Sequence, residues 1–161
     1  MIANAGLDVT MTLKTQCNIR PVRASDFDQW HALWHDYLEF YHTTLPEAVY
    51  QSTFERLLAG DAGIHGLMAE RGDQAVGLVH YIFHPTCWKV EPLCYLQDLF
   101  TVPQARGQGV ARALIEAVYA AADAAGAPTV YWLTAENNYP GRMLYDRVGS
   151  RSPFIKYTRP V

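Results

Sequence analysis

The sequence predicts an α/β protein, of the α+β kind, in which a mixed, mostly antiparallel twisted sheet of six to seven strands carries helices on both faces. Residues 95–125 have the pattern of a strand, a glycine-rich turn and an alanine-rich helix, and residues 129–134 form a β-prone stretch one crossover later. Such a strand-helix-strand unit is expected to be parallel and right-handed. Residues 66–70 and 74–84 alternate on either side of an Arg71-Gly72-Asp73 turn, which is typical of an antiparallel hairpin.

The other elements follow from local patterns. A first strand is expected over residues 18–22, and a helix with a broad aromatic face over residues 26–41. A second helix, opened by a proline, is expected over residues 46–58. A last helix is expected over residues 139–148, and a final strand is expected over residues 154–158.

Length and composition indicate one globular domain. A chain of 161 residues is long enough for one core and too short for two, so we expect a flexible tail over residues 1–15 and a single domain over residues 16–161. The net charge of −3 and the pI near 6.0 give no sign of a nucleic-acid surface, and a cationic substrate fits more easily. No apolar run is long enough for a membrane span.

The cysteines indicate a reducing compartment. Cys17, Cys87 and Cys94 are odd in number and lack the spacing of a CxxC motif, so we expect three reduced thiols. The N-terminus lacks the basic start and apolar segment of a secretory signal. We therefore expect a cytoplasmic protein.

The glycine-rich turn Gly107-Gln108-Gly109 stands at the start of the predicted long helix. The first turn of a helix has backbone N–H groups without intrahelical partners and a positive dipole end, so glycines placed there let a phosphate approach those donors. A Walker loop is excluded because no Gly-Lys-Ser/Thr follows, and a dinucleotide fingerprint is excluded because Arg112 stands where its third glycine is needed. The predicted ligand is a pyrophosphate of another kind.

Two ordered motifs give the chain a family resemblance. Gln104, Gly107 and Gly109 match the Gln/Arg-x-x-Gly-x-Gly/Ala loop that binds acetyl-CoA in the Gcn5-related N-acetyltransferase (GNAT) superfamily. The run from Asn138 to Tyr145 is similar to the family's Asn-x-x-Ala-x-x-Leu-Tyr helix, with a glycine where alanine is usual. The resemblance implies the GNAT fold and the transfer of an acetyl group to an amine.

The resemblance also implies a binding site for acetyl-CoA. The pyrophosphate is expected on backbone amides of the glycine-rich turn and the first helical turn, assisted by arginines, and the pantetheine is expected to pair with the central strand as a further strand would. The residues implied are Leu99, Phe100, Thr101, Gln104, Arg106, Gly107, Gln108, Gly109, Val110, Ala111, Arg112, Asn138 and Tyr145.

Acetyl transfer to an amine needs a neutral amine, donors for the oxyanion, and a proton for the departing thiolate. The resemblance implies Tyr145 as the acid and the backbone N–H near Leu99 as the oxyanion donor. Similar polyamine acetyltransferases have Leu-Glu-Asp where this chain has Leu96-Gln97-Asp98, and Gln97 cannot take a proton. Either Asp98 is the base, or a water chain is, or the amine arrives already neutral; Asp98 is alternatively a structural carboxylate.

The acceptor is expected beside the first helix and the central strand. The candidates for contact with it are Asp36, Glu39, Tyr41, His84, Trp88 and Gln97. A solvated helix face explains the two carboxylates equally well, and Trp88 alternatively covers the sheet edge.

Two histidine pairs have spacings that metal ions can use. His31 and His35 are four apart on a predicted helix, and His80 and His84 share a strand face. Neither pair has a third ligand nearby, so no metal is expected.

Finer details narrow the predicted function. The runs YLQDLF and VYWLT and the ending Phe-Ile-x-Tyr resemble the yeast-type histone and polyamine acetyltransferases and their bacterial relatives. The resemblance implies an acetyl-CoA-dependent N-acetyltransferase that acts on a primary amine of a small molecule, such as a polyamine or amino acid, by direct attack in a ternary complex. The alternatives are a protein-lysine acetyltransferase and a non-catalytic acyl-CoA-binding regulatory domain. A homodimer is also implied, with the final strand as its place.

Overall fold

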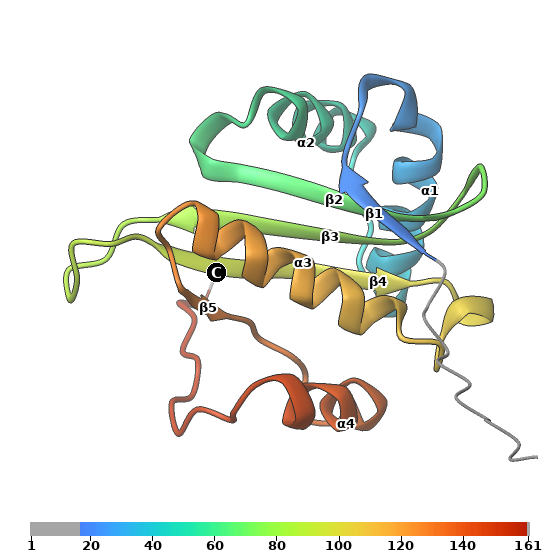
Figure 1. Ribbon diagram of the computed structural model, residues 1–161. Coiled ribbons are helices and arrows are strands. Elements are labelled where there is room, and N and C mark those ends of the chain that lie inside the picture. Colours follow the sequence, from blue (N-terminus) through green and yellow to red (C-terminus); the bar gives the residue numbers. More distant parts are fainter. Residues whose placement is uncertain (1–16, 161) are drawn as a thin grey trace, which may run out of the picture.

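Five strands form one sheet in the order β1-β2-β3-β4-β5 in the computed structural model, which describes residues 17–160 (Figure 1). The strands are β1 (Asn18–Pro21), β2 (Ile64–Arg71), β3 (Gln74–His84), β4 (Leu93–Thr101) and β5 (Thr129–Tyr131). The first four pair antiparallel and β5 pairs parallel to β4, which confirms the predicted mixed, mostly antiparallel sheet. The tail expected over residues 1–15 lies outside the described residues.

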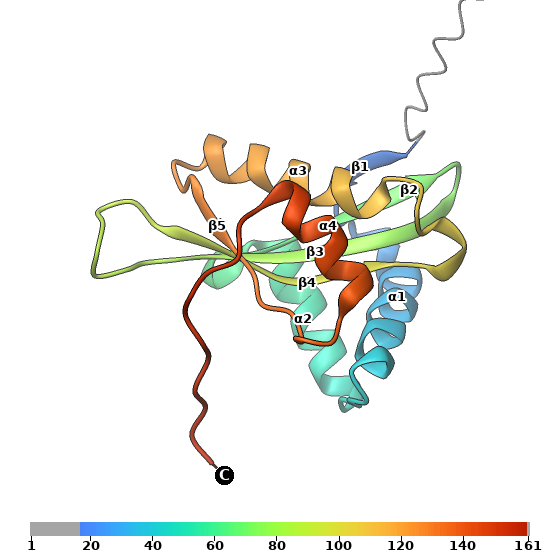
Figure 2. The same ribbon diagram turned by 90° about the horizontal axis from the view of Figure 1, so that it is seen from below.

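Helices cover both faces of this sheet, as predicted (Figures 1 and 2). The helices are α1 (Phe27–Phe40), α2 (Glu47–Ala59), α3 (Val110–Ala124) and α4 (Tyr139–Val148). Helices α1 and α2 lie on one face, α3 crosses the other, and α4 lies beyond the β5 edge (Figure 1). None of the helices described for residues 17–160 has both the length and the apolar content needed to span a bilayer.

The predicted strand count is wrong. Five strands are present in the described part of the chain, not six or seven, and residues 154–158 form none of them. Residues 150–160 are exposed and irregular and run away from the sheet (Figure 2). A β-prone sequence becomes a strand only where a neighbour offers a row of backbone partners, and this segment has none among residues 17–160. The predicted 129–134 strand likewise ends at Tyr131.

Two apolar clusters fix the helices to the sheet. Under α3, the side chains of Val79, Leu114 and Val118 are fully buried. Under α1 and α2, Trp30 is fully buried against Phe54 on the other face. Each cluster removes large apolar side chains from water, which is the main favourable term in folding.

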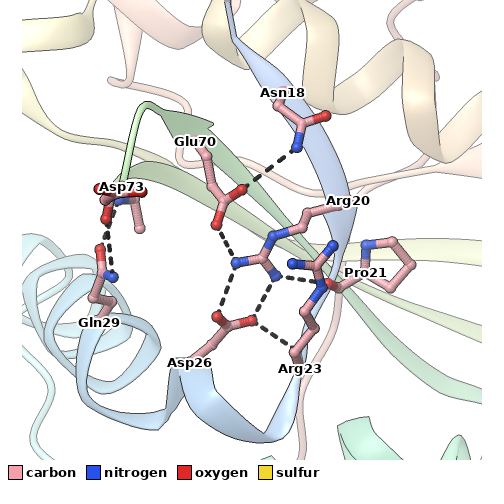
Figure 3. Close-up of polar contacts among 9 residues, drawn as sticks. Asn18, Arg20, Pro21, Arg23, Asp26, Gln29, Glu70 and Asp73 are labelled. Carbon is pink, nitrogen blue, oxygen red and sulfur yellow. Dashed lines mark hydrogen bonds and ion pairs between the residues drawn. The ribbon is translucent and has the colours of Figure 1, made fainter.

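A buried ion cluster holds the start of α1 against β1 and β2 (Figure 3). The Arg20 guanidinium donates to both oxygens of Asp26 at 2.6 and 2.8 Å, and it also donates to Glu70. The backbone N–H of Arg23 donates to Asp26 at 2.7 Å, so the carboxylate also caps the turn before α1. The hydrogen bonds from Arg20 lower the pKa values of both Asp26 and Glu70. The orientation of α1 therefore depends on charges paired out of water.

Replacing Asp26 by Asn should destabilise the protein by about 3 kcal/mol at pH 7, because buried Arg20 loses its doubly hydrogen-bonded carboxylate and keeps only Glu70 as a charged partner. The pKa of Asp26 is lowered in the folded protein, so its contribution is complete above the unfolded value near ~4 and is lost as pH falls through the folded value. Urea unfolding followed by tryptophan fluorescence should show the difference from wild type shrinking below about pH 4.

Asp28→Asn is the matched control, because Asp28 lies exposed in the first turn of the same helix. It should change the free energy of unfolding by less than about 0.5 kcal/mol. A difference for Asp26→Asn that stayed constant from pH 7 to the acid range would contradict the assigned role of its charge.

Candidate active site

Strand β4 contains a bulge at Gln97. His80 of β3 pairs with Asp98, and the next residue, Tyr81, pairs with Leu96. Gln97 therefore has no partner on β3 and is the extra residue of the bulge. A bulge bends a strand and re-aims the side chains that follow it.

The bulge moves Asp98 to the other face of the sheet. Before it, Cys94 and Leu96 point into the core under α3. After it, Phe100 points into the core under α1 and α2, although its number is also even. A shift of one residue exchanges the faces of all later side chains in a strand. Asp98 therefore lies on the α1 face and not beneath α3.

A chain of hydrogen bonds ends on Asp98. The indole Nε1 of Trp30 donates to Nε2 of His80 at 2.8 Å, and Nδ1 of His80 lies 2.9 Å from Oδ2 of Asp98. An indole can only donate, so Nε2 must accept and the imidazole proton must lie on Nδ1, from which it is donated to the carboxylate. His80 and Asp98 are only 4% and 6% exposed.

Tyr37 of α1 contacts the same carboxylate. Its hydroxyl hydrogen-bonds to Asp98, and burial followed by the charge of Asp98 raises the pKa of Tyr37. The phenol therefore stays protonated and donates. Two donors from separate elements, His80 on β3 and Tyr37 on α1, thus hold Asp98 in place.

Sequence reasoning missed Trp30, Tyr37 and His80 as members of this network. The available signal was a histidine within the apolar run of β3, since a buried polar residue needs a partner. The possible metal pair of His80 with His84 is not supported by this geometry. Both ring nitrogens of His80 are engaged, and His84 bonds to the Tyr131 hydroxyl at 3.0 Å.

Two pockets of about 300 Å³ each meet at Asp98 and Gln97, which line both. The first, called here the tyrosine pocket, is lined by Tyr37, Tyr41 and Tyr95. It also contacts the chain that follows β5. The second, called here the apolar pocket, lies between α1, α2 and the sheet and is more enclosed. Asp98 is therefore a charged group shared by two adjoining cavities.

The structure brings two of the six expected acceptor residues to these pockets. Tyr41 lines the tyrosine pocket and Gln97 lines both. The other four, Asp36, Glu39, His84 and Trp88, line neither pocket. Trp88 is 85% exposed in the β3–β4 connection.

The exposed carboxylates Asp36 and Glu39 lie on α1 beside His35, with potential ligand atoms within 4.8 Å of one another. Exposed acidic groups commonly gather without an ion, so this cluster carries no metal assignment.

The glycine-rich turn has the geometry of an anion site. Gly107 and Gly109 have φ values of +70° and +83°, which favour glycine. Gly109 precedes α3, and no side chain caps the first amides of that helix. A Cβ added to Gly107 would meet no atom within 4 Å. The turn therefore leaves open space beside unpaired N–H groups, which suits a pyrophosphate.

Side-chain hydrogen bonds stabilise the conformation of the glycine-rich turn. The Arg106 Nε donates to the Thr101 carbonyl at 3.0 Å. The Gln108 amide donates to the Gln104 carbonyl at 2.8 Å, and Arg71 donates to Gln108 at 2.6 Å. These bonds tie the turn to the end of β4 and to β2.

Strands β4 and β5 separate beyond their third pair. Pairing between them ends at Tyr95 with Tyr131, whereas β4 continues to Thr101. The backbone of Leu99 and Phe100 thus lies on a stretch of β4 that β5 does not pair. This is the edge on which a ligand could pair as a further strand would.

Helix α4 places Tyr145 beside the separation. Its ring lies 5.6 Å from that of Trp132, and burial, followed by the neighbouring Tyr41, raises the pKa of Tyr145 to about 12. The hydroxyl therefore keeps its proton at neutral pH. This is the state that a general acid requires.

Asn138 caps α4. Its Oδ1 accepts from the Gly141 N–H at 3.3 Å, and its Nδ2 donates to the Thr134 hydroxyl at 3.0 Å. A Cβ on Gly141 would lie 2.6 Å from that Nδ2. The alanine usual at this motif position would therefore displace the cap, which explains the glycine.

Comparisons with known proteins show the family. The model of the acetyltransferase (GNAT) family matches residues 29–149. The D-amino-acid N-acetyltransferase HPA3 of Saccharomyces cerevisiae is 37% identical over 144 residues, which cover 88% of this chain and 89% of that protein.

Solved structures share the fold at lower identity. The aminoglycoside N-acetyltransferase AAC(6')-Iy, in complex with CoA, has a TM-score of 0.78 and 18% identity over 89% of this chain and 94% of its own. The ribosomal-protein-alanine N-acetyltransferase of Brucella melitensis biovar Abortus has a TM-score of 0.73 and 20% identity over 90% of this chain and 99% of its own.

The hydrogen-bond chain predicts one tautomer of His80. Long-range ¹H–¹⁵N NMR should find the proton on Nδ1 and a bare Nε2 at neutral pH, because Trp30 supplies the proton of that bond. In Trp30→Phe this constraint disappears and the tautomer signal should broaden or shift, whereas the signal of His84 should not change. A proton on Nε2 of His80 in the wild-type protein would contradict the network.

Proposed function

Since the chain belongs to the acetyltransferase (GNAT) family, we propose that it transfers an acetyl group from acetyl-CoA to a primary amine of a small molecule by direct attack in a ternary complex. The observation that carries this proposal is the buried carboxylate of Asp98, which two donors hold where two small pockets meet. An amine in either pocket would find a fixed anion beside it.

An amino acid is the best supported acceptor. The relative HPA3 is named a D-amino-acid N-acetyltransferase. Pockets of about 300 Å³ suit a small molecule, and the more enclosed shape of the apolar pocket supports such an acceptor over a lysine of a folded protein. A polyamine remains the second candidate, because a carboxylate at the meeting point also attracts a cation.

Asp98 is the proposed general base. The free side of the carboxylate, whose other contacts come from His80 and Tyr37, takes one proton from the bound ammonium. The neutral amine then forms the new N–C bond and releases its second proton to solvent. His80 is a positioning residue, since its Nε2 already accepts from Trp30. Similar polyamine acetyltransferases have a glutamate at the position of Gln97. In this chain the neighbouring Asp98 would replace it as the base, because the bulge places Asp98 on the α1 face of the sheet.

The departing thiolate and the oxyanion need separate groups. The backbone N–H of Leu99 is the proposed oxyanion donor, because β5 does not pair this part of β4. Tyr145 is the proposed acid: it keeps its proton to about pH 12 and gives it to the sulfur as the C–S bond breaks. Solvent then restores the proton.

The α3 face holds the proposed acetyl-CoA site. The amides of the first turn of α3 would receive the pyrophosphate, with Arg112 at that turn and Arg106 before it as nearby positive charges. Pantetheine would follow the backbone of Leu99 to Thr101, and Asn138 would meet it from α4. The structure of AAC(6')-Iy, which shares the fold, contains CoA, and this supports acetyl-CoA as the ligand.

We also propose a homodimer. Phe154, Ile155 and Tyr157 in the C-terminal segment are between 75% and 86% exposed, an arrangement that a second copy would relieve. Sedimentation equilibrium tests this, and a monomer at high concentration would contradict it.

We also propose a cytoplasmic location, based on three cysteines that are expected to be reduced. Cell fractionation tests this location.

Turnover tests the proposed function directly. Purified protein with acetyl-CoA should release free thiol in the presence of amino acids or polyamines, and less with a basic peptide. If no acceptor gives thiol release while calorimetry still detects acetyl-CoA binding, a non-catalytic acyl-CoA-binding domain is favoured. A preference for the peptide would favour protein-lysine acetylation.

Tyr145→Phe should lower kcat about 100-fold with little change in the KM for acetyl-CoA, since it removes the phenolic proton and keeps the aromatic ring. Tyr139→Phe, on the exposed side of the same helix, should be close to wild type. Steady-state thiol release measures both. An unchanged kcat for Tyr145→Phe at every pH would rule out the general-acid role.

A further inference from the structure

The apolar pocket has two chemically different parts. Most of its wall is apolar and comes from α1, α2, β2 and β3, including Trp34, Val49, Ile64 and Ile82. Its polar groups include Asp98 from β4 and the guanidinium-bearing Arg56 from α2. A single cavity thus offers an anion, a cation and an apolar surface.

The Arg56 guanidinium can donate further hydrogen bonds to a ligand. Its Nε donates to the Ser52 carbonyl at 3.2 Å, and its Nη2 donates to the Thr53 hydroxyl at 3.1 Å. Across residues 17–160 it forms no ion pair with a carboxylate. A guanidinium held by two neutral acceptors keeps its full charge and its fork of donors, which suits a carboxylate.

A second donor at the same pocket lacks a partner. The indole N–H of Trp34 is buried without a hydrogen bond in the described part of the chain, and Trp34 is 6% exposed. Buried donors are nearly always paired, so an acceptor that reached this N–H would be stabilising. Trp34 and Arg56 both line the apolar pocket.

We propose that the apolar pocket binds a free α-amino acid with an uncharged apolar side chain, whose carboxylate pairs with Arg56 while its amine lies at Asp98. This inference rests on the proposed function, and it adds which chemical groups of the acceptor the pocket recognises. The two charges of the zwitterion meet opposite charges, and the side chain meets the apolar wall. A polyamine would place a second cation against Arg56 and is disfavoured.

The specificity of such a site follows from the polar groups that line the pocket. An acceptor without a carboxylate leaves Arg56 without a negative partner there, and sites of this kind reject analogues that lack the recognised group. A charged acceptor side chain would enter apolar surroundings without a partner. Leucine is therefore a suitable probe, and 3-methylbutylamine is its analogue without the carboxylate.

The test compares these two acceptors in steady-state thiol release with acetyl-CoA. Wild type should show kcat/KM at least tenfold higher for one enantiomer of leucine than for 3-methylbutylamine. Arg56→Gln should lower kcat/KM for leucine about 10- to 100-fold and change the amine less than about twofold. Arg56→Lys should recover part of the loss. Arg151→Gln, an exposed arginine far along the chain, is the matched control and should change neither value.

Several outcomes would overturn the inference. Equal losses for both acceptors in Arg56→Gln would reduce Arg56 to a structural role. A loss for leucine in Lys156→Gln, without one in Arg56→Gln, would move the carboxylate to the tyrosine pocket, which Lys156 lines. If Arg56→Gln does not fold, the wild-type protein still tests the inference. A higher kcat/KM for aspartate or lysine than for leucine would overturn it.

The proposed function fails in a different way. Thiol release with 3-methylbutylamine but no preference for leucine would leave the acetyltransferase assignment intact and reject the amino-acid pocket. No release with any acceptor would reject the proposed function and this inference with it.

Discussion

The buried hydrogen bonds from Trp30 through His80 to Asp98 determine how the rest of the site is arranged. A carboxylate under a packed helix is costly unless donors satisfy it, and here the donors come from β3 and α1. Because Trp30 can only donate, the direction of the whole chain of protons is fixed. Helix α1, which the ion cluster around Arg20 holds in place, is thus part of the site as well as of the core.

The sheet separates two tasks between its faces. On the α3 side, glycines with positive φ open the helix start to a phosphate, and on the α1 and α2 side two pockets meet at one carboxylate. The separation of β4 from β5 connects the two sides, and Tyr145 lies beside it. In the proposed ternary complex, a thioester and an amine would approach one another from opposite faces. The bulge at Gln97 would allow this, because it places Asp98 on the face where the acceptor is proposed to bind.

Local patterns predicted most elements well. Strand β3 and helix α4 have the predicted bounds, and the glycine-rich turn stands at the start of α3 as expected, because periodicity and glycine placement are local properties. The bulge could not be predicted, since one extra residue in β4 depends on its pairing with β3. The contact of Trp30 with His80 joins residues 50 positions apart, and only the folded chain reveals it. The prediction of a final strand was wrong for the same reason, because the sequence of a segment does not determine whether a pairing partner lies beside it.

The dependence of kcat/KM on pH, compared between wild type and Asp98→Asn, tests the central role of the buried carboxylate most directly. Asn keeps the size and can still accept from His80 but cannot take a proton from the amine. Asp98→Asn should lose most of the wild-type rate across the pH range, and its pH profile should differ in shape from that of the wild type. A variant with a near wild-type rate and the same pH profile would show that Asp98 is structural and that the amine loses its proton elsewhere.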